Sequence, residues 1–136
     1  MRQKFSTSWN SSIQPRKQRK YLANAPLHIK RKMLSANLSK EERKKYGIRS
    51  IELRKGDEVK VVRGEHTKKQ GKVASINKRK MKVSIEGVQK AKKDGTKVNL
   101  WFHASKLQII KLNADDKKRL KNLSNKQPEK KENAHN

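Results

Sequence analysis

Hydrophobic and polar positions alternate through the middle of the chain. Between residues 51 and 112, apolar residues occupy every second position of short runs, with Lys, Ser or Asn between them. A period of two is typical of half-buried β-strands. Five strands are predicted, around residues 59–61, 72–77, 81–85, 98–102 and 107–112. Five short strands in one compact segment favour a small barrel, because closure removes the exposed strand edges.

Glycine and polar residues separate these strands. Turn residues occur at Gly56-Asp57, across residues 64–71 and across residues 77–80. Asp94-Gly95 is a strong signal for a hairpin between the third and fourth strands. Asp57 is expected to close the turn after Gly56.

The N-terminal part has a different pattern. Residues 1–23 are polar and basic with no hydrophobic period, which predicts an extended arm. A short helix is predicted over residues 26–34, with its proline in the first turn. A second helix is predicted over residues 40–46, because Ser39 begins a capping box and Gly47 suits the left-handed residue after a helix.

The C-terminal part is short and polar. Asn113 is expected to cap a last helix, with Asp115 and Asp116 in its first turn. The predicted fold is mainly β, a small five-stranded barrel with a basic N-terminal extension of short helices and a short C-terminal helix. The predicted divisions are the arm (1–50), the barrel (51–112), the helix (113–123) and a disordered tail (124–136).

Charge indicates the partner. The 136 residues include 38 Lys and Arg against 12 Asp and Glu, a formal net charge of +26, and all three regions are basic. Hydrophobic residues make up only 31% of the chain, too few for one core from end to end, so we expect a polyanion to order much of it. The sequence lacks cysteine and any apolar run long enough to span a bilayer, which predicts a cytoplasmic protein without membrane insertion.

One segment is more specific. Residues 54–64, followed by residues 70–73, resemble the KOW motif, in which two strands and a glycine-bearing loop form part of an SH3-like barrel. Gly64 and Gly71 are expected to allow positive φ and close approach of the loop backbone to a phosphate or sugar. The alternative is a loop that is only a tight hairpin.

Further segments resemble one family in the same register. Residues 14–123 are similar to the archaeal and eukaryotic KOW-type large-subunit ribosomal proteins, numbered twenty-four in bacteria and twenty-six in eukaryotes. The segments that carry this resemblance are residues 24–33, 38–41, 45–50, 85–88, 94–98 and 103–107. The resemblance implies an SH3-like barrel on the 5′ domain of large-subunit rRNA, near the polypeptide exit tunnel, and a role in early subunit assembly. Implied partners are the rRNA, neighbouring large-subunit proteins and factors that dock at the tunnel exit.

The chain departs from the family at two places. Thr67-Lys68 stands where the motif loop usually has Lys-Gly, which leaves the loop conformation open. Ala104 stands where the family usually has proline between His103 and Ser105, which removes a rigid turn. Neither change removes positive charge, so rRNA binding is expected to survive both.

Candidate contacts combine point charges, guanidinium groups, aromatic rings and loop glycines, the groups that neutralise phosphates or stack on unpaired bases. The arm is expected to thread between rRNA helices, against the alternative of an unspecific solvated tail. The predicted rRNA-binding residues are Arg16, Lys17, Arg19, Lys20, Tyr21, His28, Lys30, Arg31, Lys32, Arg49, Arg63, Gly64, Lys68, Lys69, Gly71, Lys72, His103, Ser105 and Lys106.

Aromatic residues leave alternatives open. Trp101 falls on the opposite face of its strand from Phe102, so it could project outward toward RNA or a protein, or pack in the core. His103 could contact a phosphate or be a plain surface residue. Trp9 and Phe5 could anchor the arm on RNA or on a protein.

Enzyme functions are not supported. The four histidines lack ligand spacing and the chain has no nucleotide-binding fingerprint, so we predict no catalysis, no metal site and no cofactor. One alternative function is a KOW-containing transcription elongation or antitermination factor, although that class usually carries a further domain. Another is a nucleoid-type DNA-binding protein, since charge alone does not separate duplex DNA from rRNA.

Overall fold

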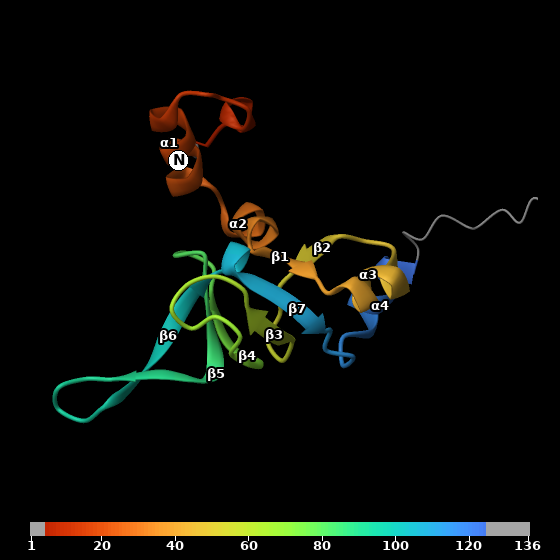
Figure 1. The fold of residues 1–136 in the computed structure, drawn as a ribbon. Coiled ribbons are helices and arrows are strands. Elements are labelled where there is room, and N and C mark those ends of the chain that lie inside the picture. The colour runs from red at the N-terminus through yellow and green to blue at the C-terminus, as the bar shows by residue number, and fades with distance from the viewer. Residues whose placement is uncertain (1–4, 125–136) are drawn as a thin grey trace, which may run out of the picture.

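The structure is a computed structural model that describes residues 5–124, and within this range seven strands form one sheet. The strand order is β2-β1-β7-β3-β4-β5-β6, an open order with β2 and β6 at its two ends. Figure 1 shows the sheet at the centre, with the β5–β6 hairpin projecting away from the N-terminal helices. The fold is therefore rich in sheet, in agreement with the mainly β prediction.

The strands include all five that the alternation predicted. These are β3 to β7. β1 adds to them from the segment expected to be an arm, and β2 adds to them at the boundary between that arm and the predicted barrel. β1 pairs antiparallel with β2 and parallel with β7, so it joins the arm to the sheet. The strand bounds are β1 (Ser35–Leu38), β2 (Ser50–Glu52), β3 (Glu58–Val61), β4 (Gln70–Asn77), β5 (Lys82–Ala91), β6 (Lys97–His103) and β7 (Leu107–Lys111).

Helices occupy both ends of the described chain. They are η1 (Thr7–Trp9), α1 (Pro15–Asn24), α2 (Leu27–Met33), α3 (Lys40–Tyr46), η2 (Ala104–Lys106) and α4 (Lys117–Ser124). Both predicted N-terminal helices are confirmed as α2 and α3. Ser39 Oγ accepts from the Glu42 amide at 3.4 Å to begin α3, and Gly47 ends it with φ +66°.

The expectation of an extended segment over residues 1–23 is wrong, because α1 lies within it. Pro15 occupies the first turn of α1, where its missing N–H has no cost. The Arg, Lys, Gln, Leu and Ala residues that follow all have good helix propensity. Local propensity therefore forms a helix here without an apolar period.

The C-terminal helix begins later than predicted. α4 starts at Lys117, and the Asp116 carboxylate accepts from the Arg119 amide at 3.0 Å. Asn113 instead accepts from the Asp115 amide in the preceding turn, at 3.1 Å. The predicted disordered tail began at Ser124, which instead ends α4, and residues 125–136 of that prediction lie outside the described range.

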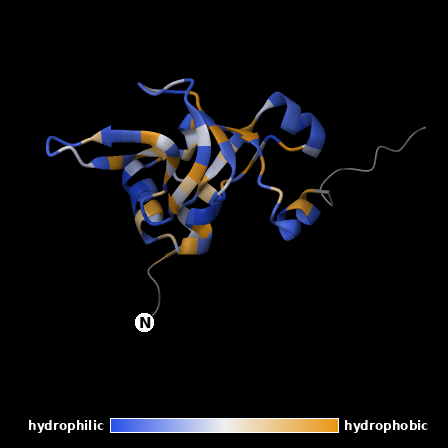
Figure 2. Ribbon diagram, turned by 90° about the horizontal axis from the view of Figure 1, so that it is seen from below, coloured by the Kyte–Doolittle hydropathy of each residue, from blue (hydrophilic) through white to orange (hydrophobic). Residues whose placement is uncertain are grey.

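Inward-facing residues of the strands make the core. In Figure 2 hydrophobic positions gather along the strands, while most of the helical surface is hydrophilic. Leu34 after α2 and Leu123 in α4 also reach this core, so segments before and after the main run of strands pack on the sheet. The most deeply buried apolar side chains are Leu34, Leu38, Val59, Val61, Val73, Val83, Ile85 and Ile109.

Three strand pairs have a register shift, and one of these shifts lies between Glu58 and Val59 in the β3–β7 pair. The β4–β5 register shifts between Val73 and Ser75, and the β5–β6 register shifts between Ser84 and Gln89. Gly87 lies within the β5–β6 shift with φ +77°. Bulges of this kind bend strands and increase their twist, which lets the long β5 serve both the compact core and the projecting hairpin.

Candidate nucleic-acid interface

All of the residues predicted to bind rRNA reach the surface. Lys17, Tyr21, Lys30 and Gly71 are half-buried, and the others are exposed. They come from the arm helices, the segment before β2, the loop of residues 62–69, the start of β4, the end of β6 and η2. The site is therefore a surface and has no enclosed reaction chamber.

The loop of residues 62–69 lies beside η2. The Val62 amide donates to the Lys106 carbonyl at 2.8 Å, which ties the start of the loop to the end of η2. The His66 ring packs edge-on against Phe102, with centroids 6.1 Å apart. These contacts bring the exposed cations Arg63, Lys68, Lys69 and Lys106 to one end of the sheet.

Lys68 itself adopts the conformation that the missing glycine would favour. Its φ is +74°, and its amide donates to the Val61 carbonyl at 2.9 Å. The Val61 amide in turn donates to the Lys69 carbonyl at 2.9 Å. The loop is thus closed by backbone hydrogen bonds although a charged residue stands at its left-handed position.

The two motif glycines have different roles. Gly64 has the predicted positive φ, at +100°, and a Cβ built there meets open space. The prediction of positive φ is wrong for Gly71, which lies in β4. A Cβ at Gly71 would lie 2.7 Å from the Glu86 carbonyl oxygen and 2.8 Å from Ile85 Cγ2. Close approach of β4 to β5, rather than of the backbone to a ligand, explains this glycine.

The turn before β7 forms without proline. Ala104 is buried at the first position of η2, and His103 precedes it in extended conformation. The His103 ring accepts from the Ser105 amide at 3.3 Å, and its Nδ1 lies 3.0 Å from Ser105 Oγ. These bonds fix an exposed imidazole beside η2.

The arm cations are partly engaged with the protein. Arg31 Nε lies 2.9 Å from Glu52 Oε2, which links α2 to β2. Lys20 Nζ lies 4.5 Å from the centroid of the Trp9 ring, and Phe5 packs against Tyr21 with centroids 5.1 Å apart. The aromatic residues of the arm therefore hold η1 and α1 together.

Trp101 projects outward from the sheet. Its side chain is 44% exposed, whereas Phe102 on the opposite face is 9% exposed. Its cross-strand neighbour is Ser84 on β5. The alternative of core packing is therefore excluded.

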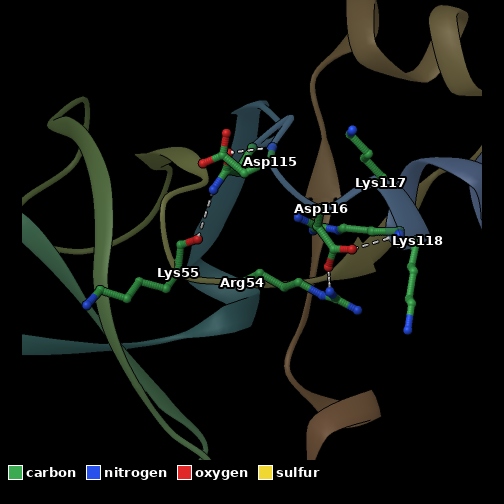
Figure 3. A pocket seen from close by; sticks show the side chains of 8 residues that line it. Arg54, Lys55, Asp115, Asp116, Lys117 and Lys118 are labelled. Carbon is green, nitrogen blue, oxygen red and sulfur yellow. Dashed lines mark hydrogen bonds and ion pairs between the residues drawn. The ribbon is translucent and has the colours of Figure 1, made fainter.

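A second group of charges, which the sequence reasoning did not place in the interface, lies beside α4 (Figure 3). Arg54, Lys55, Lys117 and Lys118 surround a surface hollow together with Asp115 and Asp116. Arg54 forms an ion pair with Asp116. Mixed charge and internal pairing make this hollow less attractive to a polyanion than the loop and η2.

Other ligand classes find little support in the described part of the chain. Within residues 5–124, His, Asp and Glu do not form a group of three suited to a metal ion. Each helix in that range is too short or too polar to cross a membrane.

A small basic sheet with an exposed cationic loop is a surface of the kind that nucleic acid favours. The comparisons agree, because the model of the family described as the eukaryotic L26 and archaeal L24 ribosomal proteins matches residues 12–126. The chain belongs to this ribosomal protein family.

Three similar proteins that share the name uL24 come from archaea. The chain is similar to the large ribosomal subunit protein uL24 of Sulfolobus acidocaldarius, with 47% identity over 80% of this chain and 81% of that protein. The uL24 proteins of Korarchaeum cryptofilum and Saccharolobus solfataricus are each 45% identical, covering 85% and 82% of this chain and 88% and 94% of their own lengths. The predicted family is confirmed, and with it a non-enzymatic structural protein of the cytoplasmic ribosome.

Proposed function

We propose that this protein is a structural constituent of the large ribosomal subunit and binds large-subunit rRNA through the loop of residues 62–69, η2 and the arm. The observation that carries this proposal is the hydrogen-bonded junction of the loop with η2, which gathers exposed cations at one end of the sheet. Lysine and arginine there would neutralise phosphates, while backbone N–H groups of the loop would fix the register on the RNA.

The proposal includes an SH3-like unit formed by β3 to β7. Two observations support it. β3 and β7, the first and last of these strands in the sequence, are neighbours in the order β7-β3-β4-β5-β6. Register shifts interrupt the β4–β5 and β5–β6 pairs, and the strands share a single hydrophobic core. η2 precedes the last strand and presents Ser105 and Lys106 at the surface.

The finer placement follows the family resemblance. We propose that the binding site lies on the 5′ domain of the rRNA near the exit tunnel, that neighbouring large-subunit proteins cover part of the remaining surface, and that binding occurs early in assembly. Factors that dock at the tunnel exit are further proposed partners. The positive charge of the whole chain supports early binding, since +26 favours rapid encounter with a polyanion.

Sedimentation of a cell extract at high salt tests the proposal. The protein is expected in the large-subunit peak at near-stoichiometric amount, as measured by mass spectrometry across the gradient. Recovery with RNA polymerase would favour the transcription factor, and recovery with chromatin would favour the DNA-binding protein. Either result would overturn the ribosomal proposal.

Salt dependence measures how much of the charge meets RNA. If the arm and the loop together neutralise about eight phosphates, log affinity should fall with log salt concentration at a slope of about −6 to −7. Filter binding of the full chain to large-subunit rRNA gives this slope. Duplex DNA at the same salt is the matched control and is expected to bind more weakly.

A further inference from the structure

A cavity of about 410 Å³ lies between the N-terminal arm and the sheet. Trp9 and Tyr21 line it from the arm, Met33 from the end of α2, and Met81 and His103 from the β5–β6 side. Its volume is within the range of about 300–1,000 Å³ that small-molecule sites occupy. The cavity exists because distant parts of the sequence meet there.

Its lining suits a flat aromatic ligand with polar edges. Indole, phenol and imidazole rings provide stacking surfaces, and two methionine side chains provide adaptable apolar contacts. Asn10 and Gln18 add amide groups of the kind that hydrogen-bond base edges. Gln18 Nε2 donates to the Ser12 carbonyl at 2.8 Å, which fixes the orientation of that amide.

One cation contacts the lining of the cavity, and others are sequence neighbours of lining residues. Lys20 Nζ lies 4.5 Å from the centroid of the Trp9 ring. Exposed Lys32 precedes Met33, and the exposed residues Lys78, Arg79 and Lys80 precede Met81. A ligand that brings phosphates to the rim and an aromatic ring to the interior is therefore complementary to the site, as one nucleotide of an RNA chain is.

Met81 has an unusual backbone conformation at this site. Its φ is +52°, in the left-handed region that non-glycine residues seldom adopt. The turn before it is held by Asn77 Oδ1, which accepts from the Lys80 amide at 3.0 Å. Strained residues of this kind gather at functional sites, which is a second reason to assign a ligand to the cavity.

We propose that this cavity receives one unpaired nucleobase of the bound RNA, which stacks against the Trp9 ring. The proposal rests on the proposed function, because it names the part of the RNA that one region of the interface would hold. Phosphates on either side of the base would meet the lysines and arginines at the rim. The base and its phosphates would fix the docked position of η1 and α1.

Tryptophan fluorescence tests the inference directly, because the chain has only two tryptophans. Trp101→Phe leaves Trp9 as the single reporter in the full chain. Large-subunit rRNA fragments are expected to quench Trp9 emission at saturation, because bases stack on indole. Inorganic polyphosphate, a polyanion without bases, is expected to bind and to leave the emission unquenched. Equal quenching by both polyanions, or by neither, would overturn the inference.

The rRNA affinity of Trp9 variants tests the base-binding cavity independently of fluorescence. Trp9→Leu is expected to weaken rRNA binding about tenfold, the equivalent of one lost stacking contact, with the salt slope unchanged. Trp9→Phe keeps an aromatic wall and should retain most of the affinity, provided that circular dichroism shows both variants folded. Lys68→Gln is the matched charge control and should reduce the magnitude of the slope by about one. Equal losses for Leu and Phe would contradict stacking.

Two results separate this inference from the function on which it rests. If the unsubstituted chain fails to bind large-subunit rRNA more tightly than duplex DNA, the proposed function fails. If it binds rRNA tightly while Trp9 emission is unchanged, only the base-binding cavity fails. Quenching by RNA-free ribosomal proteins but not by rRNA would assign the cavity to a protein side chain and would also overturn it.

Discussion

Arg119 forms a bidentate ion pair with the carboxylate of Asp57. Nη1 donates to Oδ1 at 2.7 Å and Nη2 donates to Oδ2 at 3.0 Å, and the two side chains are 4% and 0% exposed. Nη2 also donates to the Glu52 carbonyl at 2.6 Å. Asp57 further accepts from the backbone amides of Arg54 and Asn113. The pair therefore joins α4 to the turn before β3.

Removal of one partner should strongly destabilise the protein. Asp57→Asn leaves a buried guanidinium group without its counter-ion, and we expect a loss of about 3–5 kcal/mol in the free energy of unfolding. Urea denaturation followed by circular dichroism measures it. Arg54→Gln is the control, because Arg54 is 43% exposed in its pair with Asp116, and an exposed pair contributes about 0–1 kcal/mol. Similar losses for both variants would contradict the buried role of Asp57.

Two substitutions at Lys68 should affect RNA binding equally but the stability of the fold differently. A lysine at φ +74° carries backbone strain that glycine does not, so Lys68→Gly is expected to stabilise the chain by about 1 kcal/mol. Lys68→Gln retains the strain and loses the same charge. Both variants should weaken rRNA binding alike, while only Lys68→Gly should raise the denaturation midpoint. A lower midpoint for Lys68→Gly than for Lys68→Gln would show that the conformation is not strained.

Gly71 should tolerate no side chain. Gly71→Ala places a methyl group against the Glu86 backbone and Ile85, and overpacking of this kind costs about 1–3 kcal/mol. Gly64→Ala is the matched comparison, since its Cβ meets open space and only its φ of +100° is unfavourable. Thermal unfolding measures how much each substitution lowers the melting temperature, by steric clash at Gly71 and by backbone strain at Gly64. The Gly71 variant should also change amide chemical shifts at Glu86, and the Gly64 variant should not.

The hairpin at Asp94 should loosen in acid. Hydrogen bonds from the Thr96 hydroxyl and amide lower the pKa of Asp94 from its ordinary value of 3.8. The turn is therefore stabilised above that ordinary value, and this stabilisation is lost as pH falls through the lower folded value. An NMR titration should show Asp94 titrating below 3.8, with the Thr96 amide shifting in parallel. Asp94→Asn keeps an acceptor oxygen but cannot ionise, so the Thr96 amide shift should no longer depend on pH. If this variant shows the same pH-dependent Thr96 shift as the unsubstituted chain, Asp94 is not its cause.

Local patterns predicted the local elements well. Period-two alternation identified β3, β5 and β6, and the stretches 72–77 and 107–112 identified β4 and β7. The capping box at Ser39 with Gly47 identified α3. These signals act over a few residues, so they can be read from a single sequence. The positions of the exposed loop and arm cations followed from the same reasoning, because charged side chains seldom become buried without a partner.

Features that depend on distant contacts could not be predicted in this way. β1 alternates polar and apolar over only four residues, a run too short to predict a strand, and it forms because β2 and β7 supply its hydrogen-bond partners. Arg119 follows two lysines in a basic helix, where nothing nearby in the sequence indicates burial, yet it pairs in the interior with Asp57, 62 positions earlier. The cavity beside Trp9 likewise needs α1, α2 and the sheet together.

The parallel pairing of β1 with β7 has a consequence for the timing of folding during synthesis. Asn37 and Leu38 pair with Gln108 and Ile109, and the Ser39 amide donates to the Ile109 carbonyl at 2.8 Å. A chain made from its N-terminus cannot form this ladder until its last strand has left the tunnel of the ribosome that makes it. Until then the cations of the basic arm have no completed sheet beside them, and they are exposed to any RNA near the new chain.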